Sequence, residues 1–281
     1  MRKRSFVIGA IAMVIAAAGV WSYPYWHTAY LICSLAKSES LSFQMEATLE
    51  PERLSKGQKQ FLQTLSWILQ IEDESCLKWR AKGMLSGHQG YAELYCEAFK
   101  EPLTETYFNK DEVLVNIRMI YEKLQGEFRK AHPLLGNMLP DWAYETYISL
   151  EQLQEIFEVD LKEMFQQSAA SGLKPQSLWK NLLTLNRMKR HKTRSGEWQF
   201  QTTWNHYRIA LQAGKNSDNK SFARLTGADA EKSQQIKSFV FLVSSEEKKV
   251  VNIPDSCMGT EEIRQFQKFW QTLKGFTEGR K

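Results

Sequence analysis

Cysteine is scarce in this sequence: 281 residues contain four, and no two of them form a Cys-x-x-Cys pair. Structural zinc sites are usually built from such pairs, so the sequence argues against one. Cys76 and Cys96 flank a predicted hairpin. They would either form a disulfide across it or lie there as small buried apolar residues, which is the commoner arrangement for cysteine. The sequence leaves both alternatives open.

The motifs of several enzyme classes are also missing. The histidines are isolated, without the His-Glu-x-x-His spacing of zinc proteases. The chain has no Gly-x-Ser-x-Gly turn, no phosphate-binding loop and no dinucleotide-binding glycine pattern. Ser34–Lys37 matches the Ser-x-x-Lys of penicillin-binding enzymes, but the pattern recurs at Ser177–Lys180 and no Lys-Thr-Gly follows. We therefore predict a protein that is not an enzyme and that has no cofactor and no metal.

An excess of charge is absent from most of the chain. Arg2, Lys3 and Arg4 account for much of the formal net charge of +5, and the other 34 basic residues nearly balance the 32 acidic ones. A nucleic-acid partner needs a basic surface, so none is expected. Hydrophobic residues make up 43% of the chain and include 9 Trp, which predicts a folded core rather than disorder.

The N-terminus contains the strongest pattern. The basic tip of residues 1–4 precedes an uncharged, apolar stretch at 5–25, and aromatic residues close that stretch at Trp21, Tyr23, Tyr25 and Trp26. A helix of about 20 apolar residues crosses a bilayer, basic residues stay on its cytoplasmic side, and aromatic rings prefer its interface. The pattern predicts a single-pass protein of the cell membrane, with a cytoplasmic tip and an extracytoplasmic remainder.

Two alternatives remain for the apolar stretch. Ala16–Ala18 would suit a signal peptidase, whereas the aromatic rim is typical of an uncleaved anchor. Cys33 follows large residues instead of the small ones of a lipoprotein signal. We expect an anchor, a linker or short helix at 26–40, and an extracytoplasmic domain at 41–275. A split of that domain near 172–190 would give two similar halves.

Residue periodicity predicts an α+β domain. Alternating apolar and polar residues, together with turn signals, predict strands at 41–49, 76–85, 91–100, 104–108, 112–117, 145–149, 184–193, 197–203, 206–213, 221–226, 236–243 and 248–253. Ser86–Gly90 is predicted as the turn of the first hairpin. Helical spacing predicts helices at 51–70, 118–130, 149–170, from Pro175, and at 260–274, and Ser149 with Gln152 suits a capping box.

The densest basic cluster after the tip has two interpretations. Its members are Arg187, Lys189, Arg190, Lys192 and Arg194. It is a candidate contact for anionic lipid headgroups or wall polymers, where each charge contributes up to about 1 kcal/mol. Alternatively, it is the solvated face of an edge strand, where basic residues deter unwanted strand pairing. We expect the second and keep the first as a candidate site.

The predicted order over 41–275, behind the membrane segment, is one strand, a long helix and then a meander of antiparallel strands. This order, and the strand–turn–strand segment Glu101–Ile117, resembles the LolA/LppX-like envelope lipid-binding proteins. The resemblance implies a curved, half-barrel-like antiparallel sheet packed against helices, with a hollow that holds a lipid chain. No binding residue is carried over, and the lipoprotein signal of some members is missing here.

These observations lead us to expect a non-enzymatic protein of the bacterial envelope that binds a lipid, another hydrophobic ligand or an envelope component. A protein-interaction or regulatory ectodomain that pairs through a sheet edge is one alternative. An unrecognised cell-wall enzyme and a structural module of a larger assembly are others. An apolar hollow favours the first function, a bare edge strand the second, and a polar cleft with converging carboxylates the enzyme.

Overall fold

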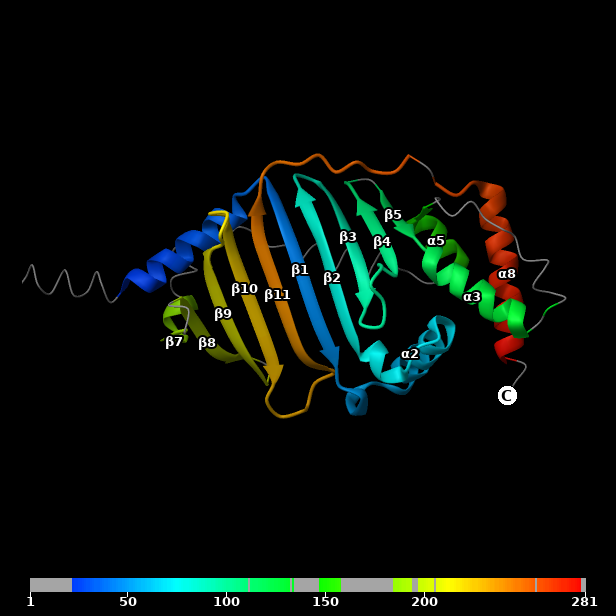
Figure 1. Cartoon of the computed structure of the whole chain (residues 1–281), viewed down its shortest axis with the longest axis horizontal. Coiled ribbons are helices and arrows are strands. Elements are labelled where there is room, and N and C mark those ends of the chain that lie inside the picture. Colours follow the sequence, from blue (N-terminus) through cyan, green and yellow to red (C-terminus); the bar gives the residue numbers. More distant parts are fainter. Residues whose placement is uncertain are drawn as a thin grey trace, which may run out of the picture.

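The computed structural model describes residues 22–110, 112–131, 133, 147–157, 184–193, 197–204, 206–255 and 257–278. Its centre is an antiparallel sheet of 11 strands in the order β6-β5-β4-β3-β2-β1-β11-β10-β9-β8-β7. The first and last strands, β1 and β11, pair with each other in the middle (Figure 1). The order ends at β6 on one side and at β7 on the other, so the sheet is open.

The first half of the sheet follows the predicted alternation. Its strands are β1 (Ser40–Leu49), β2 (Lys78–Ser86), β3 (Gln89–Cys96), β4 (Thr104–Phe108), β5 (Val113–Asn116) and β6 (Ile148–Ser149). The predicted turn at Ser86–Gly90 was too long, because β3 already begins at Gln89. Gly87 has a φ of 60°, a left-handed conformation that glycine adopts without steric cost, and so the chain reverses within two residues.

The second half contains β7 (Lys189–Lys192), β8 (Trp198–Trp204), β9 (Tyr207–Lys215), β10 (Ser221–Asp229) and β11 (Ile236–Glu246). Two strand predictions were wrong here. Residues 184–186 are helical, so the strand predicted at 184–193 is confined to β7. Residues 248–253 form no strand, because β11 already pairs with β10 and β1, and β1 with β2, which leaves no edge near β11.

The helices lie toward the two ends of the sheet. They are α2 (Lys56–Leu69), α3 (Arg118–Ala131), α5 (Leu150–Phe157) and α8 (Thr260–Glu278), and a further helix covers 22–36. Figure 1 shows the four labelled helices toward the β4–β5 side and helix 22–36, in blue, at the opposite end. The predicted capping box at α5 is confirmed, since Ser149 and Gln152 exchange hydrogen bonds between side chain and backbone. The helix predicted from Pro175 lies outside the described residues.

Successive residues of a strand point to opposite faces, so the register defines two faces of the sheet. One face, called the apolar face, carries Leu41, Phe43, Met45, Ala81, Leu85, Leu94, Ile209, Leu211, Leu225, Phe239, Phe241 and Val243. The other, called the charged face, carries Gln44, Glu46, Arg80, Lys82, Glu93, Tyr95, Gln212 and Arg224, together with Val240 and Leu242.

Two buried clusters pack helices against the apolar face. Helix 22–36 contributes Tyr25 and Ala29 to the first, where they meet Leu185 and Phe200, with Leu211 packed alongside. The second holds α2 against β2 and β3 and consists of Leu65, Leu69, Cys96 and Leu103, with Ile71, Trp79, Phe99 and Met119 around them. Both clusters lie away from the middle of the sheet. The described helices therefore bury the ends of the apolar face, and its centre is only partly buried.

Candidate functional site

The centre of the apolar face is only partly buried. Phe43, Phe241 and Val243 all retain some exposure, and Met45 and Leu85 expose 40% and 38% of their surface. These side chains lie on three adjacent strands, β2, β1 and β11, and form one continuous patch. Soluble proteins seldom leave such a patch exposed unless it meets a ligand, a membrane or another protein. This patch is the first candidate site.

Phenylalanine rings lie flat on this face because glycines face them on the neighbouring strand. Phe43 is in register with Gly83, and a Cβ on that glycine would lie 2.7 Å from the ring. Phe239 covers Gly227 in the same way, at 2.2 Å, and Phe108 covers Gly90 at 2.4 Å. Such pairs replace a side chain by an aromatic surface. The result is a smooth apolar floor.

On the charged face, the side chains of Lys82, Glu93 and Tyr95 interact with one another. The Lys82 ammonium lies 2.8 Å from Glu93, and the Tyr95 hydroxyl donates to the same carboxylate oxygen at 2.5 Å. Burial alone would raise the pKa of Glu93, but the hydrogen bonds from Lys82 and Tyr95 outweigh it and lower that pKa. The hydrogen bond to Glu93 is also the main cause that raises the pKa of Lys82. The three groups form a matched network.

A tyrosine cluster continues the charged face toward β6. The rings of Tyr107 and Tyr147 meet edge to face with centroids 5.6 Å apart, and the Tyr147 hydroxyl donates to Glu105 at 3.3 Å. Burial, the neighbouring Tyr147 and the Glu105 carboxylate together raise the pKa of Tyr107 to about 12. Burial is also the main cause that raises the pKa of Tyr147. These phenols therefore stay protonated at neutral pH.

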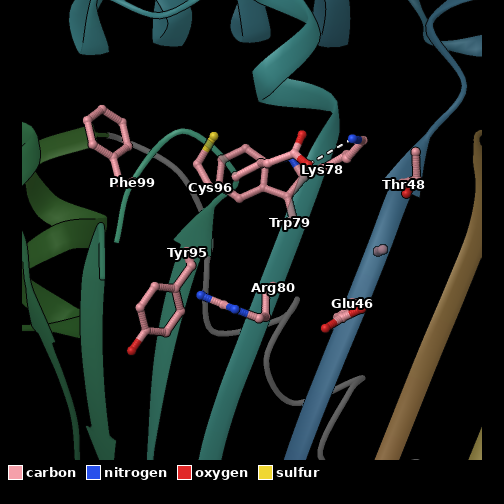
Figure 2. Close-up of a pocket in the computed structure, with 10 residues that line it drawn as sticks. Glu46, Thr48, Lys78, Trp79, Arg80, Tyr95, Cys96 and Phe99 are labelled. Atoms are coloured by element: carbon pink, nitrogen blue, oxygen red, sulfur yellow. Dashed lines mark hydrogen bonds and ion pairs between the residues drawn. The ribbon is translucent and has the colours of Figure 1, made fainter. Parts of the chain in front are cut away.

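Shallow hollows lie on the charged face. Figure 2 shows one of about 250 Å³, in which Arg80 extends toward the ring of Tyr95 and Glu46 lies on the neighbouring strand. The Arg80 guanidinium carbon is 4.8 Å from the centroid of that ring. A second hollow of about 520 Å³ is lined by Gln44, Glu46, Gln212 and Arg224, among others. Their linings mix charges, amides and aromatic rings.

The charged face, as far as the structure describes it, carries no candidate metal site, and its carboxylates pair with neighbouring side chains. Across the described ranges, no group of three or more His, Cys, Asp or Glu side chains is placed to hold a metal ion. Glu93 is engaged by Lys82 and Tyr95, and Glu46 accepts a hydrogen bond from Gln44 at 3.1 Å. The carboxylates are thus tied to basic, hydroxyl or amide partners. That the protein is not an enzyme stays a prediction.

The predicted basic cluster lies on β7, the outermost described strand of the second half. Arg190 points to the apolar face, where its guanidinium carbon lies 5.0 Å from the ring of Tyr25 and 5.4 Å from that of Trp198. Lys189 and Lys192 are exposed, as is Arg187 just before the strand. Arg194 lies outside the described residues. The structure therefore brings the cluster beside helix 22–36, a contact that the sequence did not indicate.

The residues predicted for the membrane boundary lie in different environments. Arg2, Lys3, Arg4 and Trp21 are outside the described residues. Tyr23 and Trp26 are exposed, at 58% and 41%. Tyr25 instead is buried, at 8%, with its ring centroid 5.2 Å from that of Phe200. Within the described part of the chain, no helix is both long and apolar enough to cross a membrane.

Cys76 and Cys96 are both buried, and Cys96 belongs to the cluster beneath α2. This agrees with their interpretation as small core residues, and a disulfide between them stays a prediction. Comparisons of the chain with protein-family models, with curated proteins and with solved structures find no match.

Proposed function

We propose that this protein is a non-enzymatic, membrane-attached envelope protein that binds a hydrophobic ligand, an acyl chain above all, on its apolar face. The observation that carries the proposal is the partly exposed patch around Met45 and Leu85, floored by the flat ring of Phe43. The attachment rests on the apolar stretch at 5–25. Each CH₂ group removed from water on this floor would stabilise the complex by about 0.8 kcal/mol.

The dimensions of the patch suit a long, narrow ligand. The strands β2, β1 and β11 of the patch and the next strand, β10, make a strip about 14 Å wide at a spacing of about 4.8 Å. Gly83 and Gly227 leave room for rings to lie over them, because neither has a side chain that would project from the apolar face. A chain lying here would contact apolar side chains of several strands at once.

We also propose that the sheet is curved into a half-barrel of the LolA/LppX-like type, with the apolar face turned inward. The open strand order and the glycines inside β2, β3 and β10 support this, because glycine within a strand commonly marks a bend. An inward apolar face would enclose an acyl chain on more than one side. Most of its surface would then be removed from water.

Pairing through a sheet edge has less support. The outermost described strands are β6, with 2 residues, and β7, with 4 residues that are all basic or histidine. Short and basic edges discourage the addition of another strand. An enzymatic function has less support too, since the carboxylates of the charged face are engaged by neighbouring side chains.

The test compares two adjacent residues that point to opposite faces. The full chain is purified from membranes of a bacterial host, and retained lipid is measured by native mass spectrometry and organic extraction. Met45→Glu places a charge on the apolar face, whereas Gln44→Glu places the same side chain on the charged face. We expect near-stoichiometric lipid in the unmodified chain and in Gln44→Glu, and at least fivefold less in Met45→Glu. Equal retention in the two variants, or no lipid in the unmodified chain, would contradict the proposal.

A further inference from the structure

The basic strand β7 is fixed close to the end of the predicted membrane segment. Helix 22–36 contains the last residues of the apolar stretch at 5–25, and Tyr25 is the last of these. Arg190 contacts the ring of Tyr25 at 5.0 Å. The contact holds β7 at the level of the first turns of this helix.

The side chains around this contact are basic and aromatic. Arg187, Lys189 and Lys192 are exposed, and residues 184–193 contain no acidic residue. Glu197 precedes β8, and its carboxylate accepts a hydrogen bond from Gln212. On the helix, Tyr23 and Trp26 are exposed. Exposed rings next to several cations are typical of protein surfaces that rest on the headgroups of a membrane.

We propose that β7 binds the headgroups of anionic phospholipids in the leaflet from which helix 22–36 emerges, and so fixes how the sheet is oriented on the membrane. The occupant follows from continuity with the apolar stretch at 5–25 and from charge complementarity. Surface potentials act within about a Debye length, close to 8 Å at physiological salt, and Arg190 contacts Tyr25, the last residue of the apolar stretch. The inference rests on the predicted anchor and is independent of the ligand on the apolar face.

Hydrogen exchange on the full chain tests this orientation. The protein is reconstituted in vesicles of phosphatidylcholine alone and in vesicles that also contain phosphatidylglycerol. Exchange of the backbone amides in peptides covering 186–193 is then followed by mass spectrometry. We expect exchange to be at least fivefold slower with the anionic lipid, which is about the effect of one basic side chain at a charged surface. High salt should remove the difference.

Two double variants with the same change of charge sharpen the test. Lys189→Gln with Lys192→Gln should abolish the lipid-dependent slowing, and Arg at both positions should restore it. Lys56→Gln with Lys59→Gln on α2, toward the other end of the sheet, should leave it unchanged. Equal exchange in both kinds of vesicle would overturn the proposal. So would equal slowing by a soluble anionic polymer in phosphatidylcholine vesicles, which would point to a wall polymer instead. Lipid retention by Met45→Glu reports separately on the apolar face.

Discussion

The ten residues of β1 point alternately to the two faces of the sheet, and the two faces differ in whether their side chains find partners within the protein. On the charged side, Lys82 and Tyr95 of the neighbouring strands both pair with Glu93, and Tyr95 is buried while Lys82 remains half exposed. On the apolar side, Met45 and Leu85 remain exposed although helices pack at both ends of the same face. The charged face thus pairs its polar groups within the protein, whereas the apolar face leaves apolar side chains exposed to water.

The largest expected effect comes from breaking the packing of helix 22–36 on the apolar face. Phe200 is 0% exposed and lies beneath Tyr25. Phe200→Ala should lower the free energy of unfolding by about 3–5 kcal/mol, because it leaves a cavity where a ring was buried. Gln199→Ala, the adjacent residue on the charged face, should cost under about 0.5 kcal/mol. Urea unfolding measures both, and similar losses would contradict the assignment of faces.

A somewhat smaller loss of stability is expected when a methyl group is added to a glycine of the apolar face. A Cβ on Gly83 would lie 2.1 Å from the backbone oxygen of Tyr91 as well as against the ring of Phe43. Gly83→Ala should therefore lower the free energy of unfolding by about 3 kcal/mol. Gly126→Ala on α3 is the matched control, since nothing lies within 4 Å of its added methyl group. That change should stabilise the protein by up to about 1 kcal/mol, because alanine favours helix.

The contribution of the charged face to stability should decrease in acid. The lowered pKa of Glu93 means that the carboxylate stabilises the fold above its unfolded value near 4.5 and ceases to do so as the pH falls through the folded value. Glu93→Gln should cost about 1 kcal/mol at pH 7, given that Lys82 is half exposed. The difference from the unmodified chain should shrink as the pH falls below 4.5. A difference that persists unchanged in acid would show that Glu93 acts by packing alone.

A further effect on stability is expected in alkali. Because the pKa of Tyr107 is raised from 10.0 to about 12, its contribution to stability is complete below pH 10 and is lost as the pH rises toward 12. Tyr107→Phe should lose less stability than the unmodified chain over that window. Denaturant unfolding at several pH values measures this, and parallel loss in both proteins would mean that Tyr107 titrates normally.

Much of the sheet could be predicted from local sequence. Alternation in β1 and turn residues at Asn109 and Gly87 are short-range signals, and they located most strands. What local sequence does not contain is the pairing of β1 with β11, some 200 residues later in the chain. The strand predicted at 248–253 failed for the same reason, because it had the right alternation and no edge to pair with. Long-range register, and not propensity, decided both cases.

The candidate site shows the same limit. The sequence indicated aromatic residues near a membrane and a basic cluster more than 160 residues away, but not that Arg190 would stack on Tyr25. Tyr25 was predicted in the rim because it is an aromatic residue at the end of the apolar stretch, yet it is a core residue because its ring packs against the buried Phe200. The apolar face is visible only once the register of five strands is known. No single strand shows that its neighbours are apolar on the same side.

Photo-crosslinking shows which face of the sheet an acyl chain contacts. A fatty acid that carries a diazirine group is incubated with the full chain and irradiated, and the modified residues are mapped by mass spectrometry. We expect adducts on residues of β1, β2 and β11 that share the apolar face, such as Met45, Leu85 and Phe241. We expect none on Gln44 or Lys82, which lie on the charged face. Adducts spread over both faces, or found only on the charged face, would contradict it.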